Sequence, residues 1–106
     1  MNRYFTEKIT AIQVVGGHRV RVAFRDGFTG EVDLTPLLDC GPIFEPLRDE
    51  AVFRQVSIAH GGPLWPDDLD FSPGTLRAWC EAGKFMNDDE TYSWMERHGG
   101  ASERVA

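Results

Sequence analysis

Two adjacent segments of this chain alternate apolar and charged side chains, and this pattern constrains the fold more than any other feature. Residues 19–25 alternate arginines with apolar side chains, and residues 28–34 alternate apolar side chains with Thr29, Glu31 and Asp33. Successive side chains of a β-strand point to opposite faces of a sheet, so both segments are predicted to be strands with one buried face. Antiparallel sheets with one face in water show this pattern.

The turns between the predicted strands determine how the strands pair. A three-residue turn at residues 25–27, with Gly27 in the left-handed region, keeps the apolar faces together and sets opposite charges across from each other. The resulting pairs are Val20 with Val32, Arg21 with Glu31, and Arg19 with Asp33. A second three-residue turn at residues 16–18 joins a β-branched strand over residues 9–15, which completes a three-stranded meander.

Shorter elements are predicted after the meander. Thr35 is expected to cap a short helical turn, and residues 49–54 to form a second short helix capped at its first residue. Residues 55–59 predict a fourth strand with Ile58 facing inward, and residues 64–65 predict a short fifth strand.

Two longer helices are predicted near the C-terminus. Ser72 and Pro73 form a helix start, and Gly83 is a matching stop. Asn87 and Glu90 have the spacing of a capping box for the second helix. The apolar stripe of the first helix is Leu76, Trp79 and Cys80, and that of the second is Thr91, Trp94, Met95 and His98, with Tyr92 at its margin.

These elements together predict an α+β fold, in which a three-stranded antiparallel meander is joined by one or two further short strands. A helix covers one face of the sheet, and an additional amphipathic helix ends the chain. With 106 residues, the chain has room for one domain. We expect residues 1–83 to form the core and residues 84–106 to be a helical extension rather than a separate domain, with a frayed end at residues 100–106.

The amino-acid composition limits the cellular compartment and the classes of partner that we expect for this protein. The net charge of −6 argues against a broad contact with nucleic acid, because phosphate contacts need clustered lysines and arginines. No apolar run approaches the roughly 20 residues that cross a bilayer, and the N-terminus does not read as a signal peptide. We therefore expect a cytoplasmic protein without membrane contact, in which Cys40 and Cys80 are free and mostly buried thiols.

Three sequence pieces between Asp26 and Asp70 carry a resemblance to a known family. They are DGFTGEVDLTPLL, GPIFEPLRDEAVFRQV and LWPDDLD. In this order they resemble the bacterial domain-of-unknown-function family 2442, over roughly residues 8–82. The resemblance implies a compact α+β domain, found as small stand-alone proteins that often sit beside a second small protein in toxin–antitoxin-like gene arrangements. Some members carry an additional helix-turn-helix domain.

The chain departs from the family pattern in two places. The family usually has an Asn-Gly type turn after its Trp-Pro pair, whereas this chain has Asp67 and Asp68. The sequence after Gly83 is too short for a complete helix-turn-helix domain, so DNA binding is not carried over from the family. The resemblance also supplies no catalytic residues and no cofactor.

The acidic loop of Asp67, Asp68 and Asp70, which follows His60, is the candidate for chemistry. Carboxylates can bind a hard cation or act as acid and base, so a small metal-binding or hydrolytic enzyme is one hypothesis. Aspartates before a helix cap also commonly form turns, and this is the preferred interpretation. His18, His60 and His98 lie in separate segments without ligand spacing, so no metal site and no catalytic set is predicted.

The leading hypothesis is a non-enzymatic protein-interaction module, an antitoxin-like or regulatory partner of a small basic protein encoded nearby. The aromatic terminal helix either packs on the core, buries against another chain as in a homodimer, or stays loose until bound. The candidate contact residues are Trp65, Asp67, Asp70, Tyr92, Trp94 and Met95. A third hypothesis is a DNA-binding accessory domain that uses Arg19, Arg21 and Arg25.

Overall fold

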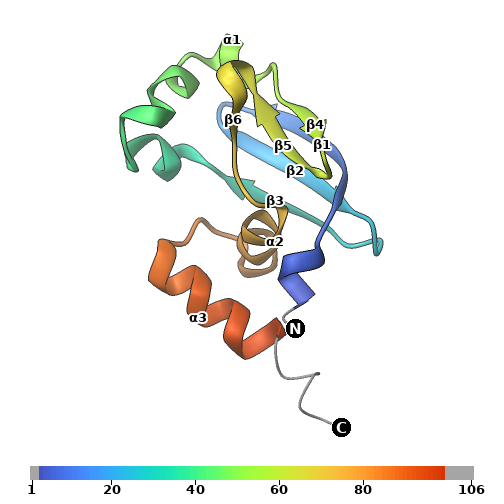
Figure 1. The fold of residues 1–106 in the computed structure, drawn as a ribbon. Coiled ribbons are helices and arrows are strands. Elements are labelled where there is room, and N and C mark those ends of the chain that lie inside the picture. The colour runs from blue at the N-terminus through green and yellow to red at the C-terminus, as the bar shows by residue number, and fades with distance from the viewer. Residues whose placement is uncertain (1–2, 100–106) are drawn as a thin grey trace, which may run out of the picture.

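The computed structural model describes residues 3–99, which form two small antiparallel sheets and a set of helices (Figure 1). The first sheet contains β1 (Ile9–Gly16), β2 (Arg19–Phe24) and β3 (Thr29–Asp33) in that order. The second contains β4 (Ser57–Ala59), β5 (Gly62–Trp65) and β6 (Leu69–Asp70). The predicted α+β class is confirmed, while the expected fraying of residues 100–106 lies outside the described residues.

The meander has the register that the alternation predicts. Val20 lies opposite Val32 and Arg21 lies opposite Glu31. Gly27 has a φ of +96°, as a left-handed turn residue requires. The side chains differ in one detail, because Arg19 contacts Glu31 at 2.9 Å although its backbone partner is Asp33. The two arginines therefore share one carboxylate on the outer face of the sheet.

The predicted cap at Thr35 is wrong, because Thr35 is the first residue of the helix and Leu34 occupies the N-cap position. The Oδ1 atom of Asp33 accepts hydrogen bonds from the backbone N–H of Thr35 at 2.9 Å and from its hydroxyl at 2.6 Å. A carboxylate oxygen accepts two donors at once, so Asp33 holds the first residue of the 3₁₀ helix Thr35–Asp39, while Leu34 at the N-cap position makes no side-chain capping bond. A second 3₁₀ helix, Pro42–Arg48, leads to α1 (Glu50–Phe53).

Two further details of the middle segment differ from expectation. Ile58 is 40% exposed rather than inward, because β4 is an outer strand of a sheet that is only three strands wide. Cys40 is exposed, whereas Cys80 is buried as expected, and burial raises the pKa of the Cys80 thiol to about 12. The strand β6 was not predicted, since two residues are too few to show an alternation.

Asp67 and Asp68 form the turn between β5 and β6, as the turn interpretation predicts, whereas Asp70 lies in β6. Their φ angles are +66° and +58°, so both adopt a left-handed conformation that glycine and asparagine accept more readily. This geometry explains why an Asn-Gly pair suits the position.

Replacing Asp68 by glycine should therefore raise the free energy of unfolding, by about 1 kcal/mol. Urea denaturation checks this value. The matched control is Gly83→Ala, where φ is +75° and no atom lies within 4 Å of an added Cβ. This control should shift stability in the opposite direction by about 1 kcal/mol. An Asp68→Gly variant less stable than the parent would contradict the backbone argument.

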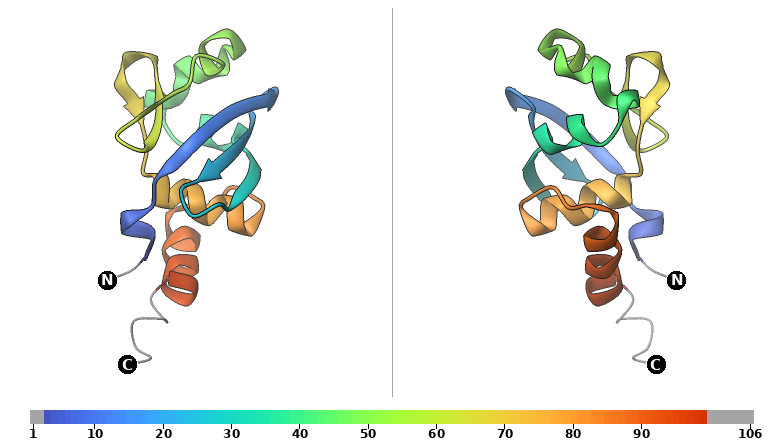
Figure 2. Two further views of the ribbon diagram at one scale, coloured as in Figure 1. Left: turned by 90° about the vertical axis from the view of Figure 1, so that its right-hand side faces the viewer. Right: turned by 90° about the vertical axis from the view of Figure 1, so that its left-hand side faces the viewer.

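The two predicted C-terminal helices are present as α2 (Pro73–Ala82) and α3 (Asp88–Gly99). The Ser72 hydroxyl accepts from the Gly74 N–H at 3.1 Å, and Gly83 ends α2 in a left-handed conformation. Asn87 and Glu90 form the reciprocal capping box, with bonds of 3.0 and 2.8 Å. Figure 2 shows α2 between the meander and α3.

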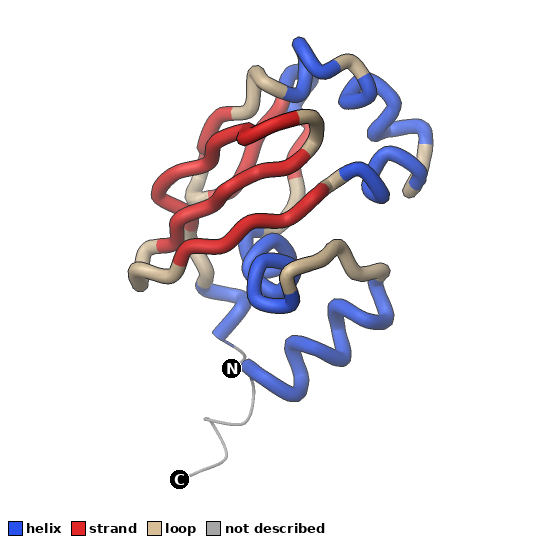
Figure 3. Tube along the Cα trace, turned by 180° about the vertical axis from the view of Figure 1, so that it is seen from behind, coloured by secondary structure: helices blue, strands red, loops and turns tan. Residues whose placement is uncertain are grey.

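Helix α2 packs closely on the meander (Figure 3). A Cβ added to Gly30 in β3 would lie 2.8 Å from the Cβ of Cys80 in α2, so glycine permits this approach. Leu76, Trp79 and Cys80 are buried, as the helical stripe predicts. No helix in residues 3–99 is long and apolar enough to cross a bilayer.

A column of aromatic rings joins the second sheet to α2 and to the segment that follows it. The rings are those of Phe53, Trp65, Phe71, Trp79 and Phe85, with successive centroids 5.5, 5.7, 5.3 and 4.6 Å apart. Aromatic pairs at these separations are favourable beyond the area they bury. The column runs from the fully buried interior to half-buried rings at the surface.

Candidate functional site

Trp65 is not available to a partner. Its residue exposure is 1%, and its indole N–H donates to the backbone oxygen of Phe53 at 2.9 Å. From the sequence, Trp65 could be either an exposed anchor for a partner or a core residue. Its place in the aromatic column shows that it is a core residue. We therefore remove Trp65 from the candidate contact surface.

The aromatic residues of α3 are mostly used within the chain. Met95 is buried, and Trp94 is half-buried with its indole N–H donating to Glu81 at 3.1 Å. The ring of Trp94 also stacks on His98, with centroids 4.0 Å apart. Tyr92 remains 64% exposed. Of the three outcomes considered for this helix, the structure shows packing on the core, with one aromatic ring left outside.

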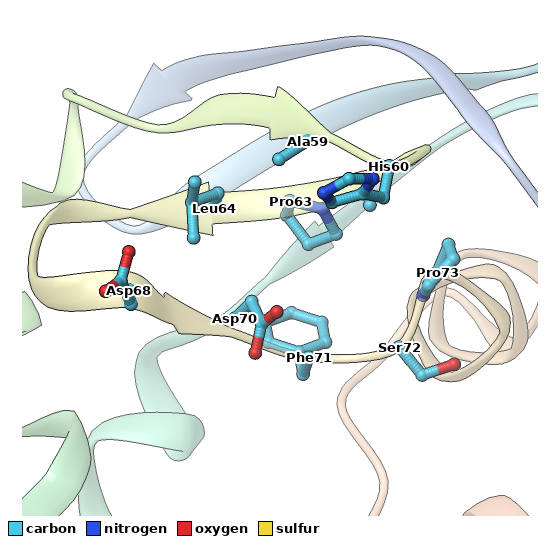
Figure 4. Close-up of a pocket in the computed structure, with 10 residues that line it drawn as sticks. Ala59, His60, Pro63, Leu64, Asp68, Asp70, Phe71, Ser72 and Pro73 are labelled. Atoms are coloured by element: carbon cyan, nitrogen blue, oxygen red, sulfur yellow. The ribbon is translucent and has the colours of Figure 1, made fainter.

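The acidic residues lie beside a concave surface. A concavity of about 430 Å³ is lined by both His60 and Asp70, together with Asp68 and Phe71 (Figure 4). Asp67 does not line it. Figure 4 shows His60 at one end of β5 and Asp68 at the other, so these side chains do not converge on one point. Within residues 3–99, no group of three or more acidic, histidine or cysteine side chains is placed to hold a metal ion.

A second concavity of about 420 Å³ adjoins the first. It is lined by Leu37, Cys40, Phe44, Phe71, Thr75, Trp79, Phe85, Met86, Asn87 and Asp88. Phe71 lines both concavities, and we call the two together the aromatic groove. Asp68 and Asp70 line the first concavity, Asp88 lines the second, and the ring of Phe71 is common to both.

The sequence patterns indicated some residues of the aromatic groove, but they did not predict that a groove exists. Asp70 was singled out, but Phe44, Phe71 and Phe85 were not. These rings come from separate segments that are 14 or more residues apart in the chain, and each segment by itself looks like an ordinary loop or helix end. Only the packing of the 3₁₀ helix Pro42–Arg48 near α2 brings them to one surface.

A charge network that the sequence did not reveal holds α2, α3 and the N-terminal residues together. The carboxylate of Glu81 accepts from Arg77 at 2.7 Å, from Arg3 at 2.9 Å, from Trp94 and from the Tyr4 hydroxyl. No periodic or motif signal marks these residues, because Arg77 and Glu81 read as an ordinary helical i, i+4 pair.

Arg77 is the buried cation of this network. It is 7% exposed and lies over the ring of Phe28, with its guanidinium carbon 4.2 Å from the ring centre. Besides Glu81, it donates to Asp26 at 2.9 Å and to Glu7 at 3.4 Å. Buried charges need such partners because they have lost water.

The network makes stability depend on pH. Burial alone would raise the pKa of Glu81, but its hydrogen bonds from Tyr4, Trp94, Arg77 and Arg3 outweigh burial and lower the pKa to about 2, from an ordinary 4.5. The unfolded chain then binds more protons between these values, so this stabilisation is complete above about pH 4.5 and is lost toward pH 2. For Glu7, burial raises the pKa, so its contribution is lost as pH rises through the folded pKa.

We therefore expect the free energy of unfolding to fall between pH 5 and pH 3, and Glu81→Gln to flatten this slope. Glu7→Gln should steepen the slope instead, since the opposing contribution is removed. Urea denaturation at several pH values measures both effects. Equal slopes in the parent and the Glu81→Gln variant would show that Glu81 does not titrate in this way.

The comparisons with known proteins agree with this architecture. The family model described as "Protein of unknown function (DUF2442)" matches residues 9–82. The chain belongs to this family. No curated protein matches the chain. The matched range ends at Ala82, the last residue of α2, so the segment 84–99, which supplies Phe85 and Asp88 to the groove, lies outside the family core.

A solved structure extends the similarity further. The crystal structure of "Putative DNA Binding Protein NE0471" from Nitrosomonas europaea ATCC 19718 is 32% identical and has a TM-score of 0.69. The alignment covers 92% of this chain and 64% of that protein. The chain therefore spans about two-thirds of the length of its structural relative.

Proposed function

We propose that this domain is a non-enzymatic protein-interaction module that holds a basic segment of another protein in the aromatic groove. The observation that supports this proposal is the presence of half-buried aromatic rings and exposed carboxylates in the lining of two concavities that share Phe71. The aromatic and acidic lining of the surface indicates the chemistry of the partner, namely apolar and basic side chains.

Aromatic rings suit such a role because they bury much apolar area and lose little conformational freedom. Phe44, Phe71 and Phe85 are each partly exposed, so a partner would gain burial that the chain itself leaves incomplete. The carboxylates that line the two concavities, together with the net charge of −6, favour a basic partner and chiefly speed its association.

The proposal also includes a cellular role and a possible mode of self-association. An antitoxin-like or regulatory role toward a small basic protein encoded nearby, in the cytoplasm, would fit the gene arrangements that the family resemblance implies. A homodimer through α3 would have to use Tyr92, because Trp94 and Met95 pack inward.

The test is a complex purified with the tagged chain from its own host and weighed by native mass spectrometry. The proposal expects a basic protein in fixed stoichiometry, which Phe44→Asp weakens at least tenfold and Tyr92→Asp leaves unchanged. Circular dichroism confirms that both variants are folded. A chain that stays monomeric without a stoichiometric partner, or a complex sensitive to Tyr92→Asp alone, would overturn the proposal.

DNA binding is the second candidate, favoured by the name of the structural relative and by the exposed side chains of Arg19, Arg21 and Arg25. Arg19 and Arg21 both contact Glu31, at 2.9 and 2.7 Å, so part of their charge is already compensated. Duplex DNA binding that falls steeply with salt, and falls further in Arg21→Ala, would support this candidate.

A further inference from the structure

We infer that the segment 84–99, beyond the family core, determines which partner the groove accepts, by forming a pocket for one apolar side chain beside a basic residue. This inference rests on the proposed function and names its specificity-determining residues, Phe85 and Asp88. The pocket is the half of the groove bounded by Phe44, Trp79 and Phe85.

The pocket has two walls of different origin. Leu37, Phe44 and Thr75 come from the part of the chain that the family model matches. The facing wall, residues 85–88, comes from the connection between α2 and α3. The family core therefore supplies six of the ten lining residues, and the extension supplies the other four.

The wall formed by the extension is held in a defined position. The Trp79 indole N–H donates to the Thr91 hydroxyl at 2.9 Å in a buried contact, and that hydroxyl lies 2.7 Å from the backbone oxygen of Asn87. Phe85 packs on Trp79 with ring centres 4.6 Å apart. A wall that is already ordered costs little conformational entropy when a partner binds.

The lining specifies the chemistry of the occupant. Leu37, Trp79 and Met86 are buried apolar residues, so this part of the pocket suits an aliphatic or aromatic side chain. Asp88, in the first turn of α3, lines the same pocket and supplies its negative charge. An apolar residue flanked by lysine or arginine satisfies both features.

The experiment titrates the ¹⁵N-labelled full chain with three synthetic hexapeptides and follows the tryptophan indole signals by NMR. The peptide KKFLKK carries an apolar anchor between basic residues, KKSGKK lacks the anchor, and EEFLEE reverses the charge. KKFLKK should shift the Trp79 signal and bind at least tenfold more tightly than the other two. The Trp94 signal should stay in place, since that indole is bonded to Glu81 outside the groove.

Three variants assign the specificity. Phe85→Leu should weaken KKFLKK at least threefold, and it keeps an apolar wall so that the fold is preserved. Asp88→Lys should weaken KKFLKK and strengthen EEFLEE at least threefold each. Asp89→Asn is the matched control, because Asp89 is adjacent in α3 but does not line the pocket, and its binding should match the parent.

Equal binding of KKFLKK and KKSGKK, a movement of the Trp94 signal instead of Trp79, or an Asp88→Lys variant with unchanged preference would each overturn this inference. The proposed function is judged separately, by the native complex and its sensitivity to Phe44→Asp. A native complex that tolerates Phe85→Leu and Asp88→Lys would keep the proposed function and reject the role of the extension.

Discussion

Replacing Glu81 by alanine is expected to lower the free energy of unfolding by about 3 kcal/mol. Four donors lose their shared acceptor in this variant, and Arg77 keeps only Asp26 and Glu7 as partners. The expected loss of stability is therefore that of breaking a largely buried ion pair. It is reduced because the carboxylates of Asp26 and Glu7 still compensate the charge of Arg77. Urea denaturation followed by circular dichroism measures the change.

Glu31→Ala is the matched control, because Glu31 also contacts two arginines but on the exposed outer face of the meander. Exposed ion pairs are screened by water and contribute little, so this variant should stay close to the parent in stability. A loss in Glu81→Ala as small as that in Glu31→Ala would mean that the network around Arg77 does not hold the helices together.

Replacing Trp65 by alanine should cost about 3–5 kcal/mol, because it removes a fully buried aromatic ring and leaves a cavity. The ring stacks between Phe53 and Phe71, and its N–H satisfies the Phe53 carbonyl, so the aromatic column would be interrupted in its middle. The loss approaches the total stability of many single domains, so a lower denaturant midpoint or partial unfolding in buffer is the expected result.

Tyr92→Ala provides the aromatic control for this prediction. Tyr92 is 64% exposed on α3, and its removal should change the free energy of unfolding by less than about 0.5 kcal/mol. Trp65→Phe should fall between these two variants, since it keeps a ring in the column but loses the hydrogen bond to Phe53. A Trp65→Ala variant as stable as Tyr92→Ala would contradict the placement of the ring in the core.

The aromatic column and the network around Arg77 also position the walls of the proposed groove. Both substitutions should therefore affect the groove as well as stability. Trp79 belongs to the aromatic column and anchors α3 through Thr91. Glu81 fixes α3 a second time through Trp94. Loss of either anchor should therefore weaken partner binding through movement of the segment 85–88, in addition to its effect on stability.

Local sequence patterns were sufficient for the elements whose partners lie nearby in the chain. The register of β2 and β3 follows from alternation and one three-residue turn, and the limits of α2 and α3 follow from caps within one helical turn of each end. These features depend on backbone geometry and on neighbours a few residues away, which a sequence displays directly.

The burial of Trp65, the exposure of Ile58 and the network around Arg77 depended on contacts between distant segments. Whether an aromatic ring is an anchor or a core residue is decided by what packs on it, and Phe53 and Phe71 do so here. The aromatic groove has the same origin, since its rings gain a common surface only when α2, α3 and the 3₁₀ helix Pro42–Arg48 pack together. Periodicity records which face of an element is buried, but it carries no information about which other element covers that face.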